Sequence, residues 1–74
     1  MYRFLVIVEQ TDGNYSAYSP PDLPGGCVAT GATREEVEER MHEAIEFHIE
    51  GLREDGLPIP PSRSSAIYVA VGRG

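Results

Sequence analysis

The sequence predicts an α+β domain in which one helix packs on one face of a small mixed sheet of three to four strands. Residues 33–53 repeat apolar side chains at steps of three and four, which is typical of an amphipathic helix. Short apolar runs with period-two alternation lie on both sides of it and predict strands. The predicted order is β-β-β-α-β, and the 74 residues form one domain, 1–74, with a small core.

The first predicted strand spans residues 2–9. It is apolar on both faces, with Phe4, Val6 and Val8 on one and Leu5 and Ile7 on the other. Such a strand is expected to be covered on both sides, although one helix covers only one face of a sheet. The Asp12-Gly13 pair predicts a tight turn to an antiparallel strand at residues 15–19.

Two further strands are predicted, at residues 27–30 and 66–71. Residues 20–26 separate the second strand from the third and hold three prolines and two glycines, which excludes regular structure there. In the last run, AIYVAV, the larger aliphatic residues Ile67, Val69 and Val71 alternate with Ala66, Tyr68 and Ala70. This pattern predicts a closing fourth strand.

Both ends of the predicted helix, about residues 34–55, carry capping signals. Thr33 followed by Glu36 is a capping box, in which the two side chains accept hydrogen bonds from free backbone N–H groups. Gly56 suits the left-handed position of a Schellman motif. The face expected to contact the sheet comprises Val37, Met41, Ala44, Ile45, His48 and Leu52.

The formal net charge is −6, and all six basic residues are Arg. Nucleic acid binding needs clustered positive charge, so we expect no direct nucleic acid contact. An acidic surface of this kind suits either simple solubility, which is the favoured interpretation of the charge alone, or a basic protein partner. No apolar run approaches the roughly 20 residues of a membrane span, and the N-terminus lacks the features of a signal peptide. We therefore expect a cytoplasmic protein.

No catalytic constellation is evident in the sequence. His48 lies within the apolar helix face and Cys27 is the single cysteine, so both are interpreted as core residues. The Glu9, Asp12 and Asp22 carboxylates come from a strand end and two loops, and a metal-dependent nuclease using them is the less favoured alternative. We predict no cofactor and no metal site.

A series of motifs resembles the HicB-like antitoxin family across nearly the whole chain. The matching stretches are YSAYSP at 15–20, PDLPG at 21–25, CVATGATREE at 27–36, EAIE at 43–46 and EGL at 50–52, followed by DGLPIP at 55–60. The sequence departs from the family pattern at Gly26, an extra glycine before Cys27, and at Val37, where the family usually has Ala. Many members continue into a DNA-binding domain, and we expect none here.

The resemblance implies a partial ribonuclease-H-like fold that acts without catalysis. It also implies a HicA-type toxin as partner, a small basic ribonuclease that cleaves mRNA. We assign partner binding to motif residues Tyr15, Tyr18, Asp22, Leu23 and Pro24. The alternative is a solitary HicB-like domain with another binding or regulatory role. Because one helix leaves a sheet face uncovered, a homodimer or higher homo-oligomer is expected.

Overall fold

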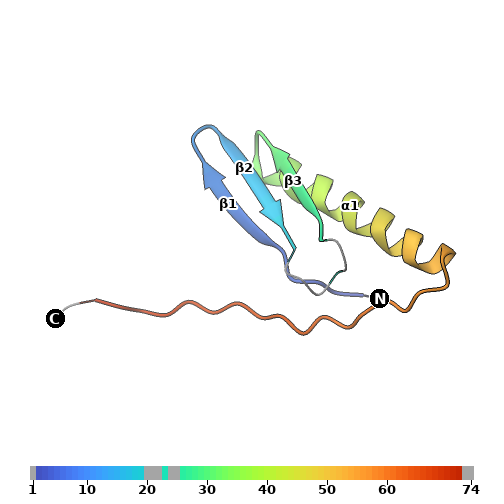
Figure 1. The fold of residues 1–74 in the computed structure, drawn as a ribbon. Coiled ribbons are helices and arrows are strands. Elements are labelled where there is room, and N and C mark those ends of the chain that lie inside the picture. The colour runs from blue at the N-terminus through green and yellow to red at the C-terminus, as the bar shows by residue number, and fades with distance from the viewer. Residues whose placement is uncertain (1, 20–22, 24–25, 73–74) are drawn as a thin grey trace.

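The structure is a computed structural model that describes residues 2–19, 23 and 26–72. In this part of the chain the order is β1 (Ile7–Thr11), β2 (Asn14–Tyr18), β3 (Val28–Gly31) and α1 (Arg34–Glu54). Figure 1 shows the helix lying against one side of the sheet, and the α+β class is confirmed.

The described strands form an antiparallel sheet in the order β1-β2-β3, not the mixed sheet that was expected. A two-residue turn of Asp12 and Gly13 joins β1 to β2, and Gly13 has a φ of 70°. Glycine adopts this left-handed conformation without steric cost, so the predicted Asp-Gly turn is confirmed. β1 begins at Ile7 rather than at residue 2 because its last partner on β2 is Tyr18, opposite Ile7.

Both ends of α1 have the predicted caps. The Thr33 hydroxyl accepts a hydrogen bond from the Glu36 N–H at 3.1 Å, and the Glu36 carboxylate accepts one from the Ala32 N–H at 3.1 Å. At the other end the Gly56 N–H donates to the Arg53 carbonyl at 3.0 Å, and the Leu57 N–H donates to the Leu52 carbonyl at 2.8 Å. This pair of bonds is the Schellman pattern.

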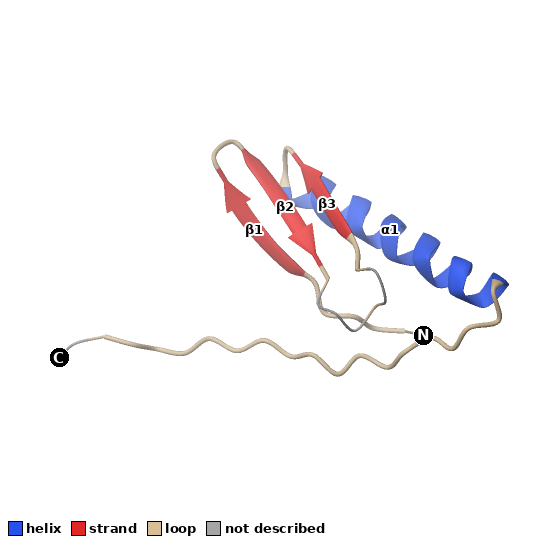
Figure 2. Ribbon diagram, in the orientation of Figure 1, coloured by secondary structure: helices blue, strands red, loops and turns tan. Residues whose placement is uncertain are grey.

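The core lies between α1 and the inner face of the sheet. Ala17, Val37 and Met41 are fully buried, and Val6, Val8, Tyr15, Cys27, Ala29 and Ile45 pack around them. The helix lies mainly over β3 and β2, as Figure 2 shows. It approaches β3 so closely that a Cβ on Gly31 would sit 2.8 Å from the Val37 nitrogen. The inner face of β1 is therefore only partly covered.

The C-terminal segment, residues 57–72, contains no helix or strand although it is fully described. The predicted fourth strand at 66–71 is not confirmed, because no described strand edge pairs with it. Figure 1 shows the segment extended and running well beyond the sheet. The radius of gyration is 14.6 Å, against about 11 Å expected for a compact chain of this length.

Candidate functional site

The face of the sheet that α1 does not cover has an apolar row at one end. The strand register aligns Ile7, Tyr18 and Val28 across the three strands, with Glu9, Ser16 and Thr30 in the next outward-facing row. Tyr18 and Val28 are both exposed. We call this side of the sheet the open face. Its row at the Ile7 end is apolar, and the adjacent row is polar.

Tyr18 lies close to an acidic neighbour on this open face. The negative charge of the Glu9 carboxylate, followed by partial desolvation, raises the pKa of the Tyr18 hydroxyl above its ordinary value. The Tyr18 hydroxyl thus interacts with the Glu9 carboxylate, while the Tyr18 ring belongs to the apolar row. Such a combination suits protein recognition.

The loop between β2 and β3 is closed by hydrogen bonds at its stem. The Ser19 N–H donates to the Cys27 carbonyl at 3.0 Å, and the Cys27 N–H donates to the Ser19 hydroxyl at 2.9 Å. Leu23, a described residue between them, is only 1% exposed. The extra Gly26 has a φ of 65° and donates its N–H to the Leu23 carbonyl at 3.0 Å, so this departure from the family pattern occupies a turn position that favours glycine.

The residues assigned to partner binding from the sequence do not share one surface. Tyr18 is exposed on the open face, whereas Tyr15 packs against the core on the helix side. Leu23 is buried. Asp22 and Pro24 lie outside the described residues. Within the described part of the set, Tyr18 is the side chain with an exposed surface to offer a partner.

The outer face of α1 carries a feature that the sequence analysis passed over. Phe47 is 80% exposed, and Glu43, Glu50 and Glu54 lie three, four or seven residues from it along the helix. Phe47 falls outside the apolar stripe of the helix, and that position is the sequence signal for an exposed aromatic. We call these four residues the acidic helix face.

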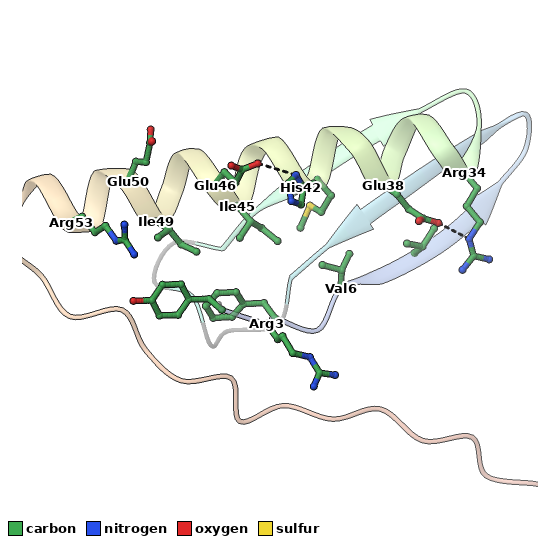
Figure 3. Close-up of a pocket in the computed structure, with 14 residues that line it drawn as sticks. Arg3, Val6, Arg34, Glu38, His42, Ile45, Glu46, Ile49, Glu50 and Arg53 are labelled. Atoms are coloured by element: carbon green, nitrogen blue, oxygen red, sulfur yellow. Dashed lines mark hydrogen bonds and ion pairs between the residues drawn. The ribbon is translucent and has the colours of Figure 1, made fainter.

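An open groove of about 770 Å³ lies between α1 and the N-terminal part of the chain. Val6 and Val8 from β1 and its approach line one side, and Ile45 and Ile49 from the helix line the other. In Figure 3, Ile45 and Ile49 point from the helix into the space beside the N-terminal segment that carries Arg3 and Val6. The rim is charged and includes the Arg34–Glu38 ion pair at 2.9 Å.

The cysteine and the two histidines, which are the side chains considered for catalysis, lie on or against the helix. The Cys27 thiol lies 3.9 Å from the Ala44 carbonyl, and its burial raises its pKa, which disfavours the reactive thiolate. The buried Nε2 of His48 has no hydrogen-bond partner within the part of the chain that the structure describes. His42 Nδ1 lies 2.9 Å from a Glu46 carboxylate oxygen, one turn along the helix.

The carboxylates of the metal-dependent alternative are placed only in part. Glu9 lies on the open face and Asp12 in the hairpin turn, while Asp22 lies outside the described residues. Across residues 2–19, 23 and 26–72, no group of three or more His, Cys, Asp or Glu side chains is arranged to hold a metal ion. In the same ranges, no helix is long and apolar enough to cross a membrane.

The described residues thus present three distinct surfaces: the acidic helix face, the apolar row of the open face and the apolar groove. Residues 4–71 match the family described as the HicB-like antitoxin of bacterial toxin-antitoxin systems. The chain belongs to this family, and that membership indicates a role in binding rather than catalysis.

Two relatives show similar levels of identity. A 14.9 kDa protein from the rep-hol intergenic region of Haemophilus phage HP1 (strain HP1c1) is 38% identical over 64 residues, which cover 86% of this chain and 47% of the phage protein. A UPF0150 protein of Synechocystis sp. is 38% identical over 61 residues, which cover 81% of this chain and 75% of that protein. The chain thus spans about half the length of the phage relative. No solved structure is significantly similar to this chain.

Proposed function

We propose that this protein is an antitoxin that binds a HicA-type toxin, a small basic ribonuclease that cleaves mRNA, and neutralises it by covering its active site. The observation that carries the proposal is the family match, which extends over residues 4–71. The net charge of −6 supports it, because an acidic surface steers a basic partner toward binding. The protein would act in the cytoplasm, where mRNA is the toxin's substrate, and its β-β-β-α order would be a partial ribonuclease-H-like fold in shape and not in chemistry.

We place the proposed toxin-binding surface on the acidic helix face, and an exposed aromatic ring among glutamates supports this choice. An exposed aromatic ring costs little side-chain entropy on binding and is typical of binding hot spots. An Arg of a basic partner can stack on the Phe47 ring while the surrounding glutamates neutralise its charge. The open face around Tyr18 is the alternative surface. Asp22 and Pro24, also assigned to binding from the sequence, lie outside the described residues.

The experiment is a binding titration with the product of a neighbouring reading frame that encodes a small basic protein. We expect a 1:1 interaction of the subunits that weakens as salt rises, and rescue of growth when both proteins are co-expressed. A full-length protein that binds no such product and gives no rescue would leave the solitary binding domain as the better interpretation.

The two surfaces are separated by a pair of aromatic truncations. Phe47→Ala is expected to weaken toxin binding by about 30-fold, the effect of losing a hot-spot side chain. Tyr18→Ala serves as the control and is expected to leave the affinity nearly unchanged. The reverse result would move the toxin to the open face. Circular dichroism shows whether both variants keep their fold, as expected for exposed side chains.

A further inference from the structure

The C-terminal segment exposes its apolar side chains in a strand-like alternation. Ile67 is 81% exposed, Val71 is 89% exposed, and Tyr68 and Val69 are also exposed. An extended run of this kind leaves both its backbone hydrogen-bonding groups and its apolar surface in water. Because the family match extends to residue 71, this run belongs to the domain and is not an appendage to it.

The folded body, meaning here residues 7–19, 23 and 26–56, offers a matching acceptor. β1 is an edge strand, since the sheet order is β1-β2-β3 and no described segment pairs with the outer edge of β1. Beside that edge lies the groove lined by Val6, Val8, Ile45 and Ile49. The helix lies over β3 and β2, so this side of the inner layer is the uncovered one.

The segment and the groove are complementary in pattern and in charge. A strand added to β1 places alternate residues on the same face, so Ile67, Val69 and Val71 together would cover the groove. Residues 64–72 contain no charged side chain, which suits an apolar floor with a charged rim. A basic partner would have to place its charges over that apolar floor.

The course of the segment points to the edge strand of another molecule. Ser62, Ser64, Ser65 and Ala66 line a shallow hollow together with residues 3–5 of the same chain. Beyond that point the segment leaves the body, as Figure 1 shows, and the molecule reaches 54 Å along its longest axis against 28 Å and 20 Å along the others.

We propose that residues 66–71 of one copy add as a fourth strand to the outer edge of β1 of a second copy, and that the exchange is reciprocal. Of the two edge strands, β1 and β3, β1 is the one with the uncovered groove beside it. Each chain therefore has one strand to give and one groove-bearing edge to receive it, and a reciprocal two-fold dimer satisfies both. The exchange closes the groove in each copy. This inference does not depend on the identity of any toxin.

The first test is the mass of the full-length protein by sedimentation at tens of micromolar. The expected mass is twice the 8.1 kDa of the chain. Val69→Asp places a charge over the apolar floor and is expected to weaken dimerisation by about 100-fold. The matched control is Ala70→Asp, which adds the same charge on the opposite face of the strand and should leave the dimer intact.

Three outcomes of this test would overturn the proposal. A wild-type monomer would mean that the segment stays unpaired or folds onto its own β1. A dimer that survives Val69→Asp but is lost in Tyr18→Asp would place the interface on the open face. Equal effects of the substitutions at residues 69 and 70 would show that the two side chains do not face opposite sides of an added strand. Val69 is exposed in the single chain, so its replacement leaves the body folded, which circular dichroism checks.

The second test separates exchange from any symmetrical contact. Ile49→Asp damages the acceptor groove and Val69→Asp damages the donor strand, so each variant alone is expected to be monomeric. When the two variants are mixed, Ile49→Asp supplies an intact donor strand and Val69→Asp supplies an intact acceptor groove. A heterodimer is therefore expected, and native mass spectrometry at protein concentrations up to hundreds of micromolar detects it. Failure to form it would contradict the exchange.

Discussion

β1 has the weaker strand pattern in the sequence but forms a paired strand, whereas residues 66–71 have the stronger pattern and form none. Three of the five residues of β1 are polar, whereas residues 66–71 are wholly apolar and alternate more regularly. Nevertheless β1 is paired and residues 66–71 are not. β1 meets its partner across a two-residue turn, which closes at low entropic cost, while residues 66–71 follow a long connector with three prolines. Pairing therefore depends on an available edge more than on the strength of the strand pattern.

The largest expected difference between the folded body and the C-terminal segment comes from truncating one apolar side chain in each. Met41→Ala should lower the free energy of unfolding by about 2–5 kcal/mol, because Met41 is fully buried in the core. Ile67→Ala should change the free energy of unfolding of the monomer by less than about 0.5 kcal/mol, because Ile67 is exposed. Urea unfolding followed by circular dichroism measures both. A large effect of Ile67→Ala at low protein concentration would show that the segment docks on its own chain.

Two glycine substitutions sharpen the comparison within the folded body. Gly31→Ala is expected to destabilise it by about 1–3 kcal/mol, because the added Cβ would meet the Val37 backbone. Gly51→Ala is the control on the exposed side of α1, where no described atom lies within 4 Å of the added Cβ. It should stabilise the protein by about 0.5–1 kcal/mol. Thermal unfolding midpoints moving in the same direction would contradict the close packing of α1 on β3.

The helix cap provides a smaller effect. Thr33→Ala removes the acceptor of the Glu36 N–H and should cost about 1 kcal/mol. Thr33→Ser keeps a hydroxyl and should restore most of that loss. Chemical denaturation of the three proteins decides the matter, and equal losses in the Ala and Ser variants would show that the hydroxyl does not cap the helix.

An effect of similar size to that of the helix cap concerns the Cys27 thiol. Cys27→Ala should cost about 1 kcal/mol through lost packing and leave partner binding intact. Because burial raises the pKa of the Cys27 thiol, the folded state favours its protonated form. Its contribution to stability is full below the ordinary thiol pKa and is lost as the pH rises through the folded-state value.

The pH dependence of thiol alkylation compares the pKa of a thiol in the folded body with that of a thiol in the C-terminal segment. Half-maximal alkylation of Cys27 is expected at a higher pH than for the thiol of the Cys27→Ala, Ala70→Cys double variant, which lies in the C-terminal segment. Equal midpoints would mean that Cys27 is not desolvated in the folded protein.

The sequence by itself determined the local features of this protein. The helix bounds, the capping box, the Schellman end and the Asp-Gly turn all depend on residues within six positions of one another, so their hydrogen bonds are encoded where they form. The motifs at residues 15–60 also placed the chain in the HicB-like antitoxin family, as the match over residues 4–71 confirms.

Only the tertiary structure decided which surfaces are open. The position of α1 over β3 and β2 leaves the groove beside β1 uncovered, and the strand register separates Tyr15 from Tyr18 onto opposite faces. The tertiary structure also shows that Phe47 is exposed among glutamates and that residues 66–71 have no partner strand among the described residues. These outcomes depend on contacts between segments far apart in the chain. Periodicity specifies which side chains share a face, whereas packing between distant elements determines which face meets solvent.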